Sequence, residues 1–244
     1  MAVQARKRVS MYTKEQLERA IGCELSEKKV VQLNEYIEML LERNQQTNLT
    51  AITDPQEMLV KHIEDCGKLC AMLKSGENIL DVGTGAGFPG IIIAIVRDDV
   101  KVTMLDSIGK KLDFVEEVVE KLGLEAEIRN GRAEMLGKDA AFREQYDVVT
   151  ARAVADMATL AELCLPIVKV GGRMLAMKGA NARQEQEEAV GAATLLGCDD
   201  GQVVEYKLSD GSERGVICYE KIKQTPDKYP RNAAQIKKKP LKSI

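Results

Sequence analysis

Gly83, Gly85 and Gly87 alternate within the segment 81–90 (DVGTGAGFPG), directly after the short, mostly apolar run 78–80. Such a run is typical of a buried parallel strand. The apolar residues 91–96 predict a helix whose first turn accommodates Pro89. A glycine turn between a strand and a helix lets a ligand approach free backbone N–H groups. The segment therefore predicts a site for a nucleotide-containing cofactor.

The identity of that cofactor is open at this point, because residues 85–90 also match the dinucleotide fingerprint G-x-G-x-x-G. Two features favour S-adenosylmethionine over NAD. Asp81 lies two residues before the first glycine, and Phe88 followed by Pro89 occupies the turn that would face a pyrophosphate. S-adenosylmethionine has no phosphates, and its amino group and sulfonium suit a nearby acid. A tight glycine turn without a ligand is the alternative.

Polar residues follow three further expected strands, 102–106, 127–130 and 146–150. Asp106 ends the first of them, where it can accept both ribose hydroxyls of an adenosine or, alternatively, cap the helix 107–122. Ala133 and Glu134 follow the second, where they can contact an adenine edge or begin a helix. Arg152 follows the third; its guanidinium can hold the substrate or the methionine carboxylate, or be an ordinary surface arginine.

The elements that position these residues alternate between strand and helix from residue 79 onward, which predicts a doubly wound parallel sheet. After a fifth strand within 166–178 and a helix over 181–196, the runs 202–207 and 215–222 predict a hairpin. We therefore expect an α/β, Rossmann-like class I S-adenosylmethionine-dependent methyltransferase fold. Its sheet is mostly parallel and seven-stranded, with a C-terminal antiparallel hairpin.

A helical extension precedes this sheet. Thr13 and Gln16 have capping-box spacing, Ser26 can cap the next helix, and Asp54 followed by Pro55 predicts the start of another. We expect four parts: a flexible basic arm (1–12), the helical extension (13–74), the methyltransferase core (75–223) and a basic C-terminal tail (224–244).

Composition narrows the class of protein. The 244 residues contain neither an apolar run of membrane-spanning length nor a signal peptide, so we expect a cytoplasmic protein. The six cysteines form no C-x-x-C pair, which favours buried free thiols. Cys66 and Cys70 lie one helical turn apart near His62, but this is the only histidine in the chain, so we expect no metal site.

The net charge of −3 hides an uneven distribution. Residues 221–244 contain eight basic residues and one acid, and residues 1–10 contain three basic residues and no acid, which leaves a net charge of −13 for residues 11–220. Basic ends on an acidic body suit contact with a phosphate backbone, although solubilising tails have the same composition.

With these residues in place, the chain resembles the bacterial small-subunit rRNA methyltransferase G family, also called glucose-inhibited division protein B. The resemblance covers nearly the full length, except residues 1–10. It is carried by 48–51 (NLTA), 54–62 (DPQEMLVKH), 81–90, 106–111 (DSIGKK), 131–134 (GRAE), 150–154 (TARAV), 229–231 (YPR) and 237–241 (KKKPL).

The resemblance implies methyl transfer from S-adenosylmethionine to N7 of guanine-527 in the 530 loop of 16S rRNA. The partner would be 16S rRNA within the small ribosomal subunit or its precursor, and we expect a monomer. Carried over by position, the implied cofactor contacts are Gly83, Phe88, Ala133, Glu134 and Arg152. The basic tail would contact RNA phosphates, with the candidates Arg231, Lys237, Lys238 and Lys239.

Methylation at N7 constrains the catalytic residues. The N7 lone pair lies in the ring plane and no proton leaves, so neither a general base nor a catalytic cysteine is required. Catalysis then consists of holding N7 in line with the methyl group. Arg152 and Lys178 are candidates for contact with guanine O6, provided they leave N7 free. A nearby acid would favour the positive charge on N7, but the sequence does not identify it.

Other functions fit parts of the pattern. An NAD-dependent oxidoreductase would use the same sheet, and the mass of the bound cofactor would reveal it. A non-enzymatic RNA-binding protein with a degenerate pocket would show no turnover. A methyltransferase acting on another RNA, a protein or a small molecule fits the core equally well, and only the resemblance and the basic tail argue against it.

Overall fold

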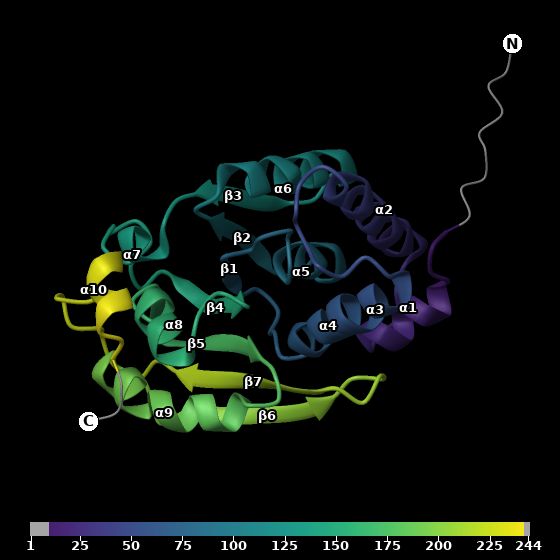
Figure 1. Cartoon of the computed structure of the whole chain (residues 1–244). Helices are drawn as coiled ribbons and strands as arrows, with labels where there is room; N and C mark the ends of the chain where they lie inside the picture. The colour runs from purple at the N-terminus through teal and green to yellow at the C-terminus, as the bar shows by residue number, and fades with distance from the viewer. Residues whose placement is uncertain (1–9, 242–244) are drawn as a thin grey trace, which may run out of the picture.

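The computed structural model describes residues 10–241 and places a seven-stranded sheet between two layers of helices (Figure 1). The first five strands are parallel, and β7 runs antiparallel to both of its neighbours. This confirms the expected fold class. The strand order is β3 (Ala126–Asn130), β2 (Lys101–Asp106), β1 (Asn78–Val82), β4 (Tyr146–Arg152), β5 (Val168–Lys178), β7 (Glu213–Glu220) and β6 (Gln202–Lys207).

The strand order reverses direction between β1 and β4, because β2 and β3 lie on one side of β1 and the later strands on the other. In open parallel sheets the loops at such a point diverge and leave a crevice at the carboxyl ends of the strands. The register brings three of these ends together, since Val82 pairs with Leu105 on one side and with Ala151 on the other. The glycine loop, Asp106 and Arg152 therefore leave the sheet at the same edge.

One face of the sheet is covered by helices that come from both the N-terminal extension and the sheet domain. The expected caps are present: Thr13 forms the capping box with Gln16, Ser26 caps the second helix, and Asp54 caps a helix with Pro55 in its first turn. These elements are α1 (Lys14–Ile21), α2 (Glu27–Asn44), α3 (Pro55–Met58), the π-helical turn η1 (Leu59–Glu64), α4 (Asp65–Cys70), α5 (Gly90–Val96) and α6 (Gly109–Leu122).

The opposite face is covered by α8 (Met157–Cys164) and α9 (Ala182–Leu195), with the short α7 (Ala133–Leu136) beside α8. Strand residues alternate between the two cores, as Ile79 belongs to the first and Leu80 to the second. Two helices begin at other residues than the sequence predicts. Pro89 directly precedes α5, and α6 begins at Gly109 after Ile108, so Asp106 does not cap it.

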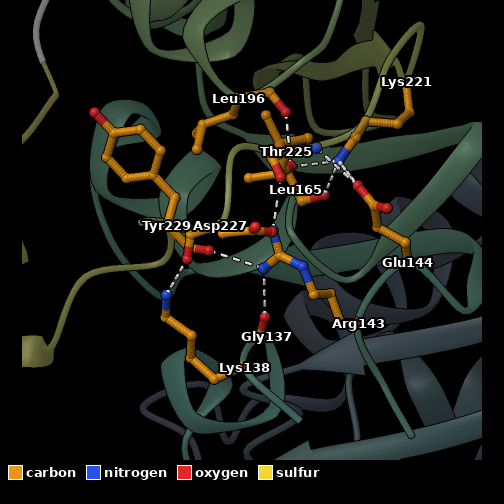
Figure 2. A network of polar contacts seen from close by, with 10 residues as sticks. All are labelled: Gly137, Lys138, Arg143, Glu144, Leu165, Leu196, Lys221, Thr225, Asp227 and Tyr229. Atoms are coloured by element: carbon orange, nitrogen blue, oxygen red, sulfur yellow. Dashed lines mark hydrogen bonds and ion pairs between the residues drawn. The ribbon is translucent and has the colours of Figure 1, made fainter. Parts of the chain in front are cut away.

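The C-terminal segment folds back onto the body, although the sequence marks it only as a basic tail. Arg143 donates to the carbonyls of Gly137, Thr225 and Tyr229, at 2.8, 2.7 and 2.8 Å (Figure 2). The buried ammonium of Lys221 donates to the Leu165 carbonyl and the Thr225 hydroxyl. These bonds fix the chain that leads into α10 (Ala233–Lys238), which packs against α8.

The expected N-terminal arm lies largely outside the described residues, which begin at Ser10. Its last residue, Tyr12, is buried and donates a hydrogen bond to the carbonyl of Pro55. All six cysteines are free; four are buried as expected, whereas Cys23 is exposed and Cys218 half-buried. No helix between Ser10 and Leu241 is long and apolar enough to cross a membrane.

Candidate functional site

A cavity of about 330 Å³ opens at the carboxyl ends of β1, β2 and β3, at the edge of the sheet predicted for a cofactor. Four of the predicted cofactor residues, Gly83, Asp106, Ala133 and Glu134, line it. The remaining wall consists of Val82, Leu105, Ser107, Ile108, Lys111, Gly131, Arg132, Val154 and Leu163. We call this the first cavity.

Asp106 joins two loops at the floor of the first cavity. Its Oδ2 accepts a hydrogen bond from the Gly85 N–H, and its Oδ1 accepts one from the Ile108 N–H, both at 2.9 Å. A carboxylate oxygen can accept more than one hydrogen bond, so each oxygen keeps capacity for a hydroxyl donor. The observed geometry therefore fits a diol such as that of a ribose.

The glycines of the loop have steric reasons to be glycine. Gly83 has a φ of +72°, and a Cβ there would lie 2.6 Å from Cγ2 of Val154, which also lines the first cavity. Gly87 has a φ of +102°, and its Cβ would lie 2.4 Å from the Ile91 side chain. Gly85 donates to Asp106. Gly83 thus lets Val154 pack closely against the glycine loop beside the first cavity, whereas Gly85 and Gly87 shape the loop itself.

Asp81 lies beneath the loop and lines neither this cavity nor the second cavity described below. Its Oδ2 accepts from the Gly90 N–H at 3.0 Å, which fixes the start of α5. Its Oδ1 is buried without a hydrogen-bond partner among the described residues, and burial raises the pKa of this carboxyl to about 6. Asp81 is therefore near the glycine loop, as expected, but its carboxylate is not exposed to either cavity.

Ala133 and Glu134 begin α7 at the far side of the first cavity, as both a helix start and an adenine contact would require. The Glu134 side chain is nearly buried and accepts a hydrogen bond from the exposed Arg132. Both predictions for this stretch are thus compatible with one geometry, because the helix start itself lines the cavity.

A second cavity, of about 700 Å³, opens at the carboxyl ends of β4 and β5. The loop after β4 forms a wall between the two cavities, since Val154 lines the first and its neighbours Ala153 and Ala155 line the second. Ala153 has a φ of +57°, a left-handed conformation that is uncommon without glycine and is often found at functional sites. The other lining residues are Ile52, Lys61, His62, Asp65, Arg152, Asp156, Met177, Lys178, Gly179, Glu185 and Arg214.

Arg152 and Phe88, both predicted cofactor contacts, lie together on the side of the second cavity. The Arg152 guanidinium lies 4.8 Å from the Phe88 ring centroid, and the His62 ring stacks on Phe88 with centroids 4.3 Å apart. Arg152 also donates to Nδ1 of His62 and lies 3.6 Å from Asp65. Phe88 is buried behind these groups. The direct walls of the first cavity include neither Arg152 nor Phe88.

His62 and Asp65 were not selected as site residues from the sequence. Both come from the stretch where α3 passes through η1 into α4. A π-helical turn inserts an extra residue into the helical repeat and often occurs at functional sites. No sequence rule locates such a turn; the available signals for His62 were that it is the sole histidine and that it ends the segment 54–62, one of those that carry the family resemblance.

Lys178, the second catalytic candidate, ends β5 inside the second cavity. Its Nζ donates to the Ala155 carbonyl at 2.8 Å and to Oε2 of Glu185 at 2.7 Å. The structure thus brings Arg152 and Lys178 together in one cavity. It also brings Glu185, which lies in the first turn of α9 and is not among the residues predicted from the sequence, to the wall of this cavity.

The predicted RNA-binding residues lie apart from both cavities. Lys237, Lys238 and Lys239 are exposed at the end of α10. Arg231 differs, because its guanidinium forms two hydrogen bonds, of 2.8 and 2.6 Å, with the fully buried carboxylate of Glu162. Its geometry is that of an anchor for the C-terminal segment. Within residues 10–241, no group of three or more acidic, histidine or cysteine side chains could hold a metal ion.

Comparison with known proteins shows which protein family this sequence matches. The family model described as rRNA small subunit methyltransferase G matches residues 29–214. A protein of Exiguobacterium sp. named ribosomal RNA small subunit methyltransferase G is 44% identical over 229 residues, covering 91% of this chain and 95% of that protein. The equally named protein of Pelotomaculum thermopropionicum is 45% identical over 228 residues, covering 91% and 95%.

Solved structures agree at the level of the fold. A methyltransferase from Pyrococcus furiosus superposes with a TM-score of 0.54 at 14% sequence identity, covering 76% of this chain and 98% of that one. At this identity the similarity bears on the fold alone.

Proposed function

Since this chain belongs to the rRNA small subunit methyltransferase G family, we propose that it transfers a methyl group from S-adenosylmethionine to N7 of a guanine in 16S rRNA, namely guanine-527 in the 530 loop. The chain is an S-adenosylmethionine-dependent rRNA methyltransferase, and the proposal adds the base, the atom and the position. The observation that carries it is the pair of cavities that share the loop after β4 as a wall.

The first cavity fits the cofactor by the chemistry of its walls. Asp106 would accept the ribose hydroxyls, Gly83 lets Val154 pack against the loop at the cavity wall, and Ala133 with Glu134 would face the adenine. When bound, S-adenosylmethionine supplies a methyl group activated by the positive sulfonium. These residues bind and orient; none of them needs to transfer a proton.

The second cavity would receive the target base. Guanine N7 presents its lone pair in the ring plane. The chain therefore has only to hold the base with N7 directed towards the first cavity and to exclude competing orientations. Such positioning is worth roughly 7 to 11 kcal/mol in favourable cases. Arg152 and Lys178 would orient the base, and Asp65, Asp156 and Glu185 supply negative charge for the N7 cation that forms.

An exposed loop is a suitable RNA substrate, because the deep, narrow major groove of A-form RNA hides N7. Lys237, Lys238 and Lys239 would contact RNA phosphates, while Arg231 holds the segment that carries them. We further propose that the enzyme acts in the cytoplasm on the small ribosomal subunit or its precursor.

The decisive experiment uses purified full-length protein, S-adenosylmethionine with a labelled methyl group, and small subunits or 16S rRNA from cells that lack this gene. Digestion should yield labelled 7-methylguanosine, and mapping should locate it in the 530 loop. A different labelled nucleoside, or a label at another site, would contradict the proposal. Transfer only to a protein or small molecule would support the alternative substrates.

A further inference from the structure

We propose that Lys178 and Glu185 form the element that distinguishes guanine from adenine, by reading the Watson–Crick edge of the target base in the second cavity. This inference rests on the proposed function, because it assigns recognition roles within the cavity that would receive the base. Glu185 accepts hydrogen bonds from the N–H groups of the base, and Lys178 donates one to O6.

The pair lies in the wall of the second cavity. Lys178 ends β5, Glu185 lies in the first turn of α9, and the two charged groups are 2.7 Å apart. The lysine side chain is only 9% exposed, and its bond to the Ala155 carbonyl fixes the ammonium against the loop after β4. Burial and these hydrogen bonds therefore hold the two charged groups in fixed positions.

Both groups retain unused hydrogen-bonding capacity. The ammonium of Lys178 has three N–H donors, of which two are used by Ala155 and Glu185. Oε1 of Glu185 has no hydrogen-bond partner within residues 10–241, while Oε2 accepts from Lys178. A donor and an acceptor thus stand side by side at the cavity.

This arrangement matches guanine and opposes adenine. Guanine presents the O6 acceptor beside the N1–H and N2–H donors, so a lysine next to a carboxylate complements its edge. Adenine presents a donor at N6 and an acceptor at N1, which would place like groups against both side chains. Recognition through this edge leaves N7 unpaired, as methylation requires.

The other charged groups of the second cavity are engaged elsewhere. Arg152 is held by His62, and Asp65 accepts from a tyrosine hydroxyl at 2.8 Å. Asp156 caps α8, Lys61 pairs with a glutamate one helical turn away, and Arg214 donates to a neighbouring carbonyl. Among these groups, Lys178 and Glu185 alone are opposite charges within hydrogen-bond distance of each other, since Arg152 and Asp65 lie 3.6 Å apart.

The volume is adequate for a base. At about 700 Å³ the second cavity falls in the range of roughly 300 to 1,000 Å³ found for small-molecule sites. Ile52 and Met177 provide apolar surface in it, and the planar guanidinium of Arg152 provides a cationic one. Together they offer the apolar and flat surfaces that an unstacked base requires.

The test compares guanosine with inosine at the target position of 16S rRNA reconstituted into small subunits. Inosine lacks only the N2 amino group, so it keeps O6, N1–H and N7 but removes one donor to Glu185. We expect wild-type protein to use inosine with a kcat/KM about tenfold lower, the effect of one lost hydrogen bond to a charged group. In Glu185→Gln, use of guanosine should fall at least tenfold and the guanosine preference should shrink to within twofold.

Glu187→Gln is the matched control, because it removes the same charge from an exposed position on α9 that lines neither cavity. It should keep the wild-type preference, and both variants should bind S-adenosylmethionine as the wild type does. An undiminished guanosine preference in active Glu185→Gln would overturn this assignment alone. No transfer by the wild type to guanosine-containing subunits would overturn the proposed function, and this assignment with it.

Discussion

The guanidinium of Arg152 donates a hydrogen bond to Nδ1 of His62, at a distance of 3.0 Å. Every nitrogen of an arginine side chain is a donor, so Nδ1 must be an acceptor. The ring proton therefore lies on Nε2, 3.1 Å from the Thr50 hydroxyl oxygen. Burial, reinforced by the charge of Arg152, lowers the pKa of His62 to about 3. A neutral histidine thus orients the arginine at the second cavity.

This neutral ring predicts a pH-dependent stability. The unfolded chain protonates His62 near pH 6.5, whereas the folded chain resists protonation down to about pH 3. The contribution of His62 is therefore complete above pH 6.5 and is lost as the pH falls. We expect the free energy of unfolding of wild type minus that of His62→Gln to decrease by about 2 kcal/mol between pH 7 and pH 5.

Urea denaturation of both proteins at several pH values measures this difference. The comparison with the variant is needed because Asp81, whose pKa is raised to about 6, stabilises the fold as the pH falls through the same range. Its contribution is common to both proteins and cancels. A difference that does not change with pH would show that His62 is not held neutral.

Gly83→Ala should abolish tight cofactor binding. Its Cβ would lie 2.6 Å from the Val154 side chain, so the glycine loop or Val154, both of which line the first cavity, would have to move, and its φ of +72° is unfavourable for alanine. Gly171→Ala is the control, because Gly171 has a φ of +85° with no atom within 4 Å of the added Cβ. Both variants should lose about 1 kcal/mol of stability or more from backbone strain. Calorimetry should show at least a tenfold loss of S-adenosylmethionine affinity for Gly83→Ala only.

Asp106→Ala should also weaken S-adenosylmethionine binding at least tenfold, while affinity for RNA remains. The change removes the proposed ribose acceptor and releases the N–H groups of Gly85 and Ile108. Asp113→Ala, an exposed change on α6, provides the control. Unchanged cofactor affinity in Asp106→Ala would refute the ribose assignment.

The sequence predicts features that depend on neighbouring residues in the chain. The alternation of strands and helices, the glycine loop and the caps at Thr13, Ser26 and Asp54 are local patterns, and each appears in the structure. The position of Asp106 also follows from the pattern, because the end of a parallel strand determines which edge of the sheet a residue occupies.

The missing features depend on contacts between distant residues. Arg152 meets His62 across 90 positions, and Arg231 meets Glu162 across 69. The phase of the π-helical turn decides that His62 faces Phe88, and no spacing rule gives it. Arg231 was therefore grouped with the solvent-exposed lysines, although its partner is a buried acid.

Arg143→Ala should uncouple RNA modification from cofactor binding. The guanidinium makes three hydrogen bonds to carbonyls, two of them in the C-terminal segment (Figure 2). Its loss should destabilise the protein by about 2 to 3 kcal/mol and speed hydrogen exchange in residues 224–241. Methylation of small subunits should fall while S-adenosylmethionine affinity stays within twofold. Equal losses of both would indicate general unfolding instead.

Joint replacement of Lys237, Lys238 and Lys239 by alanine should weaken RNA binding without affecting the cofactor. The three side chains are exposed at the end of α10, so their loss costs little stability. Each phosphate contact contributes roughly 0.7 to 0.9 to the slope of log affinity against log salt. The slope should therefore fall in magnitude by about 2 when RNA binding is titrated at several salt concentrations.

The matched control replaces three exposed lysines, Lys28, Lys101 and Lys121, at the opposite edge of the sheet. Lys101 begins β2 and Lys121 lies in the last turn of α6, so both are remote from the carboxyl ends where the cavities open. Both triple variants change the net charge equally, so a nonspecific charge effect would lower the salt slope in both. A decrease confined to the α10 variant, with unchanged S-adenosylmethionine affinity, would locate the phosphate contacts on the C-terminal segment.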